Sequence, residues 1–98
     1  MKGLEFDWDE GNVNHFLIDN KERGILIEDV ESVFHDPKAF FIFDSEKDHE
    51  KRFRIIGKTK NDVLITIIFV KRLEKTRPIT GWRLGSKSRF YKEYEKDR

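Results

Sequence analysis

The stretch VLITIIFV, residues 63–70, decides the fold. All of its side chains are apolar except that of Thr66, which interrupts the run. A strand with one face in solvent alternates apolar and polar residues, whereas this stretch is apolar on both faces. It therefore predicts the central strand of a sheet that is covered on both sides. The run is far too short to cross a membrane.

The residues before this run predict two more strands. Residues 39–43 form a short aromatic strand, and residues 52–55 alternate cleanly between basic and apolar side chains. Phe53 and Ile55 would face one side of the sheet, and the arginines at 52 and 54 the other. Polar and charged connections are expected at residues 44–51 and 57–62.

The residues after the run predict an edge strand at 76–82. Pro78 lies in its middle and has no N–H to donate to a neighbouring strand. This strand is therefore expected at an edge of the sheet, or to pair imperfectly near Pro78. A closing helix is predicted at residues 87–95, with Phe90 and Tyr94 on one face and Tyr91 beside them.

Two helices are predicted near the N-terminus, after a short alternating strand at residues 4–8. Asp9 can cap the first helix, and Gly24 is expected to end it. Asp36-Pro37 ends the second helix, because the residue before proline avoids the helical region. Helices followed by strands indicate an α+β fold, an antiparallel sheet with helices packed on it, in a single domain over residues 1–98. The apolar faces of the two helices are Val13, Phe16 and Leu17, and Val30, Val33 and Phe34.

The charges are divided unevenly along the chain. Residues 1–50 carry fourteen acidic and five basic side chains, and residues 51–98 carry five acidic and fifteen basic ones. The net charges are therefore −9 and +10, which suggests that the second half binds a polyanion. The alternative is that the two halves neutralise each other in the folded protein. There is no cysteine, and Met1-Lys2-Gly3 leads directly into an acidic segment, so we expect a cytoplasmic protein.

Three arginines are candidates for binding phosphate: Arg52, Arg77 and Arg83. The planar guanidinium can hold two phosphate oxygens at once. Arg77 and Arg83 are an even number of residues apart, so an unbroken strand would point both the same way, although Gly81 could break that register. The alternative is that these arginines are solvated or paired with the acidic half.

The aromatic and histidine residues near these arginines give weaker signals. Trp82 could stack on an unpaired base or cover the edge of the core. Tyr91 could act as an acid or orient a phosphate, but we favour a packing role. The three histidines show no metal-ligand spacing. His15 is interpreted as structural, and His49, in the charged loop before Arg52, is the histidine to test as a general base.

Several short motifs resemble one known family, in order and over nearly the whole chain. They are Phe6-Asp7-Trp8-Asp9 with Asn12, Val33-Phe34-His35-Asp36-Pro37, Arg52-Phe53-Arg54-Ile55-Ile56-Gly57, Arg77-Pro78-Ile79-Thr80-Gly81-Trp82-Arg83, and Arg89-Phe90-Tyr91. The family is that of the BrnT toxins, small ribonucleases of bacterial type II toxin–antitoxin pairs. Where its members usually carry Lys-His-Gly, this chain has Glu22-Arg23-Gly24.

The resemblance implies a RelE-like domain, with four to five antiparallel strands, two N-terminal helices and one C-terminal helix. It also implies cleavage of single-stranded RNA without a metal or cofactor, and a ribbon-helix-helix antitoxin bound in a hetero-oligomer. On this basis Arg52, Arg83 and Tyr91 are the expected catalytic residues. Arg54, Arg77, Trp82 and Arg89 are the expected RNA-binding residues. The alternative is a non-catalytic module of the same fold that binds RNA or a partner protein.

Overall fold

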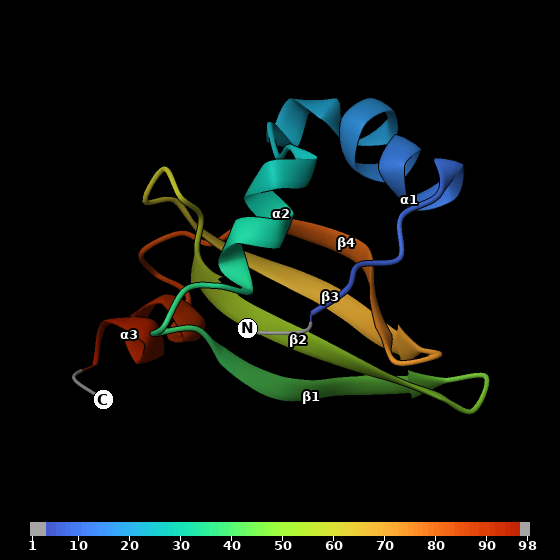
Figure 1. Ribbon diagram of the computed structural model, residues 1–98. Helices are drawn as coiled ribbons and strands as arrows, with labels where there is room; N and C mark the ends of the chain where they lie inside the picture. The colour runs from blue at the N-terminus through green and yellow to red at the C-terminus, as the bar shows by residue number, and fades with distance from the viewer. Residues whose placement is uncertain (1–3, 97–98) are drawn as a thin grey trace.

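The computed structural model describes residues 4–96. Four antiparallel strands form one sheet in the order β1-β2-β3-β4, with helical segments before and after it in sequence (Figure 1). The predicted α+β class, with two N-terminal helices and one C-terminal helix, is confirmed. The strands are β1 (Phe40–Lys47), β2 (Glu50–Lys58), β3 (Leu64–Arg72) and β4 (Lys75–Arg83). The helical segments are α1 (Glu10–Asn14), η1 (His15–Asp19), η2 (Lys21–Arg23), α2 (Ile27–Val33) and α3 (Arg89–Glu95).

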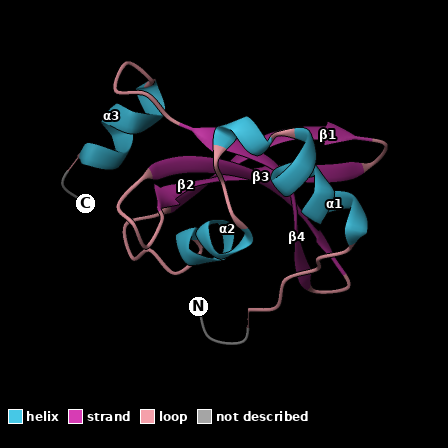
Figure 2. Cartoon of the chain, turned by 90° about the horizontal axis from the view of Figure 1, so that it is seen from above, coloured by secondary structure: helices cyan, strands magenta, loops and turns pink. Residues whose placement is uncertain are grey.

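The helices divide the sheet into a covered face and an open face. The N-terminal helices and α2 lie over one face, and α3 packs near one end of the sheet (Figures 1 and 2). The covered face holds the main core, in which Ile55, Ile65, Ile67 and Phe69 pack against α2 and η1. On the opposite face, here called the open face, Ile56 and Leu64 pack against Tyr94 of α3.

The stretch at residues 63–70 forms the central strand that its composition predicts, although helices cover only one face of the sheet broadly and α3 covers one end of the other. Strand β3 lies between β2 and β4, and it is buried without interruption from Leu64 to Val70. The edge position of residues 76–82 is also confirmed, because β4 ends the sheet. Pro78 pairs with Phe69 at a point where the register shifts by one residue. The missing N–H of proline is thereby accommodated at an irregular position.

The expected turn at residues 44–51 is wrong. Strand β1 continues to Lys47 and β2 begins at Glu50, so only Asp48 and His49 form the turn. Their φ angles are 52° and 63°, the left-handed pair typical of two-residue hairpins. Charged side chains at a sheet edge can point into solvent without ending the strand, which is why polarity alone misplaced the boundary.

The predicted N-terminal strand at residues 4–8 is reduced to one isolated bridge between Phe6 and Thr76. Two backbone hydrogen bonds of 2.8 Å hold it, from Asp7 N to Thr76 O and from Thr76 N to Glu5 O. The sheet therefore has four strands. The bridge covers part of the outer edge of β4, which would otherwise expose unpaired backbone groups.

The first helix begins as predicted and then changes its winding. The Asp9 side chain accepts a hydrogen bond from Asn12 N at the start of α1. From His15 onward the helix is of the π type, and Asn20 N bonds His15 O five residues back. The wider turn rotates the expected apolar face, so Phe16 is buried but Leu17 is exposed.

Asp36 joins three parts of the fold. Its carboxylate accepts hydrogen bonds from Lys38 N (2.9 Å), Lys58 N (2.7 Å) and Tyr94 Oη (2.6 Å). Burial alone would raise the pKa of Asp36, but the hydrogen bonds together hold it below its usual value. Asp36 thus links the end of α2 to β2 and α3 while ionised.

Replacing Asp36 with asparagine should destabilise the protein by about 1–3 kcal/mol at pH 7, because an amide has only one acceptor oxygen. A group with a lowered pKa stabilises the fold above its unfolded pKa and loses that effect as the pH falls through its folded pKa. The stability gap between wild type and variant should therefore shrink between about pH 5 and pH 3. Urea unfolding at both ends of this range measures it. A gap that stays constant would contradict this role of Asp36.

Candidate functional site

Four of the sequence-predicted site residues share the open face. Arg77 of β4 pairs with Val70 of β3. On the other side of β3, Phe53 pairs with Phe69, so the preceding residue, Arg52, lies opposite Val70. In the next rows of the sheet, Arg54 pairs with Ile68, and Trp82 pairs with Thr66. Residues paired across antiparallel strands point to the same side of the sheet. We call the group Arg52, Arg54, Arg77 and Trp82 the arginine face.

Arg54 is held at the centre of this face. Its guanidinium lies 2.9 Å from Asp44 Oδ1, and its central carbon lies 5.3 Å from the ring centre of Trp82 and 5.2 Å from that of Phe90. Cation–π contacts of this kind orient both partners. Arg54 therefore fixes Trp82 on the open face and is itself only partly available to a ligand.

Arg77 is engaged by the acidic N-terminal segment. Its guanidinium donates to both carboxylate oxygens of Asp9, at 2.9 and 3.2 Å, and Asp7 lies 3.7 Å away. The hydrogen bond from Arg77, followed by that from Asn12 N, holds the pKa of Asp9 below its usual value. A phosphate would have to compete with these carboxylates for Arg77.

Arg52 differs from these two arginines. Within residues 4–96 it makes no hydrogen bond or ion pair, and its Nε is buried without a partner. Buried donors are normally satisfied, so this nitrogen is an exception that it shares with Nε of Arg54, but the terminal nitrogens of Arg52, unlike those of Arg54, have no acidic oxygen on them. Arg52 is thus the member of the arginine face whose donors remain open.

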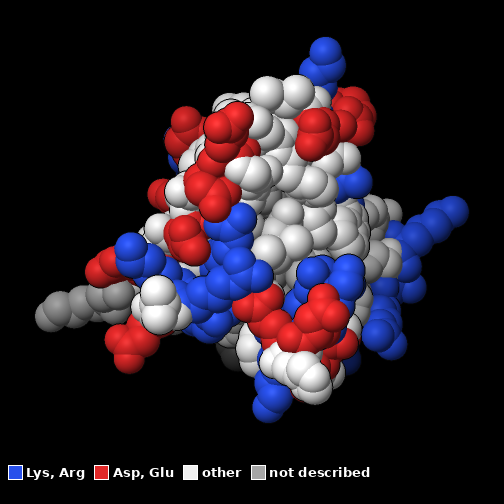
Figure 3. Space-filling view, turned by 90° about the vertical axis from the view of Figure 1, so that its right-hand side faces the viewer, with Lys and Arg blue, Asp and Glu red and all other residues white. Residues whose placement is uncertain are grey.

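The two oppositely charged halves of the chain do meet in space. Five of the seven ion pairs within residues 4–96 join an acid from residues 1–50 to a cation from residues 51–98. Figure 3 shows acidic and basic side chains next to each other on the side that carries the hairpin turns. The neutralisation expected as an alternative therefore accounts for much of the charge asymmetry.

Arg83 lies on the other side of the sheet from Arg52. The shift in register leaves Ile79 as an extra residue, so Arg77 pairs with Val70 whereas Arg83 pairs with Ile65. Residues 65 and 70 face opposite sides of β3. The break in the register thus falls at Ile79 and not at Gly81, where the sequence allowed for one.

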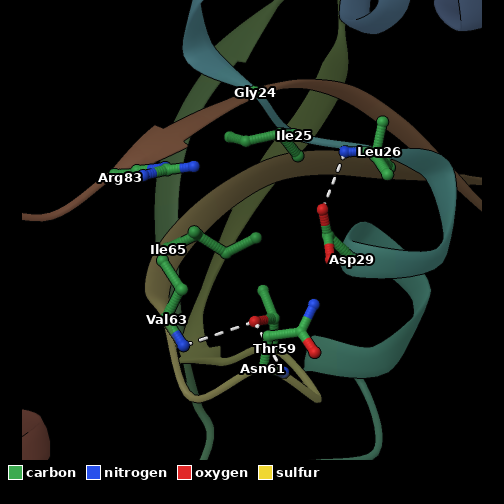
Figure 4. A pocket seen from close by; sticks show the side chains of 9 residues that line it. All are labelled: Gly24, Ile25, Leu26, Asp29, Thr59, Asn61, Val63, Ile65 and Arg83. Atoms are coloured by element: carbon green, nitrogen blue, oxygen red, sulfur yellow. Dashed lines mark hydrogen bonds between the residues drawn. The ribbon is translucent and has the colours of Figure 1, made fainter.

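Arg83 lines a pocket of about 200 Å³ at the end of β4. Its side chain extends toward Ile25 below the Gly24 backbone, while Asp29 accepts a hydrogen bond from Leu26 N (Figure 4). Gly24 has a left-handed φ of 65°, as its predicted place at the helix end requires, and its missing side chain leaves room for Arg83 Nη2.

A polar cluster that the sequence analysis missed lies at the outer edge of β4. His15 Nε2 is 2.7 Å from Thr80 Oγ1, and Arg23 Nη1 lies 3.2 Å from the same oxygen. Arg23 also donates to Gly81 O at 3.0 Å. These residues are distant in sequence and come together only because the π turn and η2 cover the β4 edge. No local signal could have found this contact.

The remaining candidates lie on or near α3 and in the hairpin turn. Tyr91 is half-buried and packs with Ile56 and Leu64, which agrees with the packing role favoured from the sequence. Arg89 is exposed, with its guanidinium 4.9 Å from the Phe90 ring centre. His49 is exposed in the turn between β1 and β2.

A comparison with protein-family models matches residues 8–87 to the ribonuclease toxin BrnT of type II toxin–antitoxin systems. The chain belongs to this family. The match covers the arginine face, the Arg83 pocket and the β4-edge residues, whereas α3 lies outside it. A comparison with curated proteins finds no match.

Membership in the BrnT family confirms the resemblance seen in the sequence. It implies an RNA substrate and an antitoxin partner. In the part of the chain that the structure describes, no group of His, Cys, Asp and Glu side chains could hold a metal ion. Nor is any helix within residues 4–96 long and apolar enough to span a membrane.

Proposed function

We propose that this BrnT-family protein is a metal-independent endoribonuclease toxin that cleaves single-stranded RNA across its open face. The observation that carries the proposal is the arginine face, on which the open guanidinium of Arg52 and the indole of Trp82, held by Arg54, lie on the same side of the sheet two cross-strand rows apart. An open guanidinium can hold a phosphate, and an indole can stack on an unpaired base. Double-stranded RNA would keep its bases stacked and could not use Trp82, so the substrate is single-stranded.

The other candidate residues extend this site along the RNA. Arg54 positions Trp82, and Arg77 and Arg89 would contact phosphates at the two ends of the open face. At the end of β4, Trp82 points to the open face and Arg83 to the covered one. A strand of RNA that passes over this end would meet both, so Arg83 would hold the next phosphate. Tyr91 would support this end of the site from α3.

The antitoxin is proposed to inhibit the toxin by covering the arginine face. A ribbon-helix-helix antitoxin with an acidic segment and a helix would fit this surface and exclude RNA. The toxin and the antitoxin would form a hetero-oligomeric complex in the cytoplasm, where the RNA substrate is found. Acidic residues of the antitoxin would pair with Arg52, which makes no ion pair or hydrogen bond of its own within residues 4–96.

The test is to express the protein from a tight promoter, with and without a neighbouring antitoxin gene. Cell growth and the integrity of total RNA are then measured. Growth arrest with cleaved RNA, relieved by the neighbour, is expected. The purified protein should also cleave a single-stranded oligonucleotide in the presence of EDTA and leave its duplex intact. Normal growth with intact RNA, at good folded expression, would overturn the proposal.

Arg83→Ala should abolish growth arrest while leaving the fold intact, because Arg83 is exposed and its loss removes a phosphate contact without a core change. Growth on overexpression and a thermal melting curve measure the two effects. Lys60→Ala is the charge-matched control, since Lys60 is an exposed cation in the β2–β3 connection. A folded Arg83→Ala protein that remains fully toxic would remove Arg83 from the site.

The second candidate function is a non-catalytic module that binds RNA or a partner protein. It is favoured by the pairing of Arg54 and Arg77 with acidic residues, which leaves Arg52 as the arginine of the arginine face without an ion pair within residues 4–96. It is also favoured by Glu22-Arg23 in place of the usual Lys-His of the family. Salt-sensitive RNA binding without cleavage products would identify it.

A further inference from the structure

The polar cluster at the β4 edge has an arrangement that packing does not require. We call His15, Asn20, Arg23 and Thr80 the β4-edge cluster. All four side chains are half-buried, so they are held in place yet reachable from solvent. The π turn that carries His15 is a rare helical geometry that occurs frequently at functional sites.

The hydrogen bonds fix the direction of each donor in this cluster. Asn20 Nδ2 lies 3.0 Å from His15 O, which can only accept, and this contact sets the orientation of the amide. The same Nδ2 lies 3.2 Å from His15 Nε2, so Nε2 must accept as well. Arg23 can only donate to Thr80 Oγ1, which leaves the Thr80 hydroxyl proton for Nε2. We therefore assign the ring proton of His15 to Nδ1 and its accepting lone pair to Nε2, where Asn20 and Thr80 donate to it.

The cluster adjoins the arginine face. Arg54, Ile68 and Thr80 form one row across strands β2, β3 and β4. Thr80 is the member of this row at the outer edge of the sheet. Trp82 follows two residues later, and two strand residues span about 7 Å. A nucleotide stacked on Trp82 would thus bring a neighbouring ribose next to Thr80 and His15.

We propose that His15 is the general base of RNA cleavage, and that Arg23 binds the scissile phosphate. This proposal rests on the ribonuclease function proposed above. The Thr80 hydroxyl turns away, and the ribose 2′-OH replaces it as the donor to Nε2 and gives its proton to that nitrogen. The 2′ oxygen forms a bond to phosphorus while the bond from phosphorus to the 5′ oxygen breaks. Arg23 and Arg52 stabilise the charge on the five-coordinate phosphate.

The step leaves a 2′,3′-cyclic phosphate on one fragment and a 5′-hydroxyl on the other. The departing 5′ oxygen takes a proton from water, and His15 later returns its proton to solvent, so atoms and charge balance. Asn20 orients Nε2 by donating to it. Asn20 is therefore a positioning residue and His15 a catalytic one.

The test compares wild type with His15→Gln and His15→Ala on a labelled single-stranded RNA. Glutamine can still accept from Asn20 and Thr80, so His15→Gln keeps the cluster but removes the base. Cleavage should fall by about 10²–10⁴-fold in both variants, while RNA binding and the melting temperature of His15→Gln stay unchanged. Added imidazole should restore part of the activity of His15→Ala. His49→Asn is the matched control, because asparagine tolerates the left-handed backbone at that turn.

The outcomes separate this assignment from the proposed function. If wild type cleaves RNA and a folded His15→Gln protein cleaves it equally well, the assignment to His15 is wrong and the ribonuclease function stands. If His15→Ala loses activity only together with its fold, and imidazole restores nothing, His15 is structural. If wild type binds RNA but never cleaves it, both proposals fail.

Discussion

Arg52→Ala is expected to lower the rate of RNA cleavage by about 10²–10³-fold, the usual effect of removing one donor that stabilises a transition-state anion. The melting temperature should fall only slightly, because the variant loses the packing of a half-buried side-chain stem but no hydrogen bond or ion pair within residues 4–96. Single-turnover cleavage of a labelled single-stranded RNA measures the rate. Arg52→Lys should recover only part of it, since an ammonium group keeps the charge but lacks the planar fork.

Lys60→Ala provides the charge-matched control for Arg52→Ala. Both variants remove one positive charge, and Lys60 lies outside the arginine face, in the β2–β3 connection. General attraction of RNA to a basic protein would lower both rates alike. Equal rates for the two variants would therefore show that Arg52 has no specific role.

Gly81→Ala should destabilise the protein by about 2–3 kcal/mol, the upper part of the usual range for overpacking. A Cβ atom at this position would lie 2.4 Å from Ile67 Cδ1 and 2.7 Å from Thr66 O. Both atoms belong to the central strand, and the carbonyl oxygen cannot move away without disturbing the sheet. Urea unfolding measures the change in the free energy of unfolding.

Gly85→Ala is the matched control, because a Cβ atom there would meet nothing within 4 Å. It should leave stability unchanged or slightly increased. Ile67→Val should relieve part of the strain in a Gly81→Ala background by removing Cδ1, so the two substitutions should couple favourably. If Gly81→Ala were as harmless as Gly85→Ala, the close packing of β4 on β3 at this point would be refuted.

The elements set by apolar pattern or backbone chemistry could be predicted from the sequence. VLITIIFV identified β3, Pro78 identified an edge strand, and Asp9 and Gly24 marked the first helical region. Each of these signals acts over a few residues. The boundaries of β1 and β2 were missed because two residues with left-handed backbones suffice to turn the chain, whatever the charge of their neighbours.

The relations between distant residues could not be predicted in the same way. The extra residue Ile79 in β4 sends Arg77 and Arg83 to opposite faces; Pro78 indicated imperfect pairing nearby, but not which residue is extra or which side chains change face. The sequence favoured His49 as the base to test because it lies just before Arg52 in the chain, and this stays a prediction. In the folded protein His15 meets Thr80 because the N-terminal helices cover the β4 edge.

The central claim is that single-stranded RNA binds the open face at Arg52 and Trp82. The most direct measurement is an amide and indole chemical-shift map of the labelled protein as an uncleavable 2′-deoxy oligonucleotide is added. The chain has two tryptophans, and Trp8 serves as an internal reference because its Nε1 donates to Glu31 at 2.8 Å. We expect large shifts at the Trp82 indole and along Arg52 to Arg54, with the Trp8 indole unmoved. Shifts confined to the helical side, or an unmoved Trp82 indole at saturation, would contradict the account.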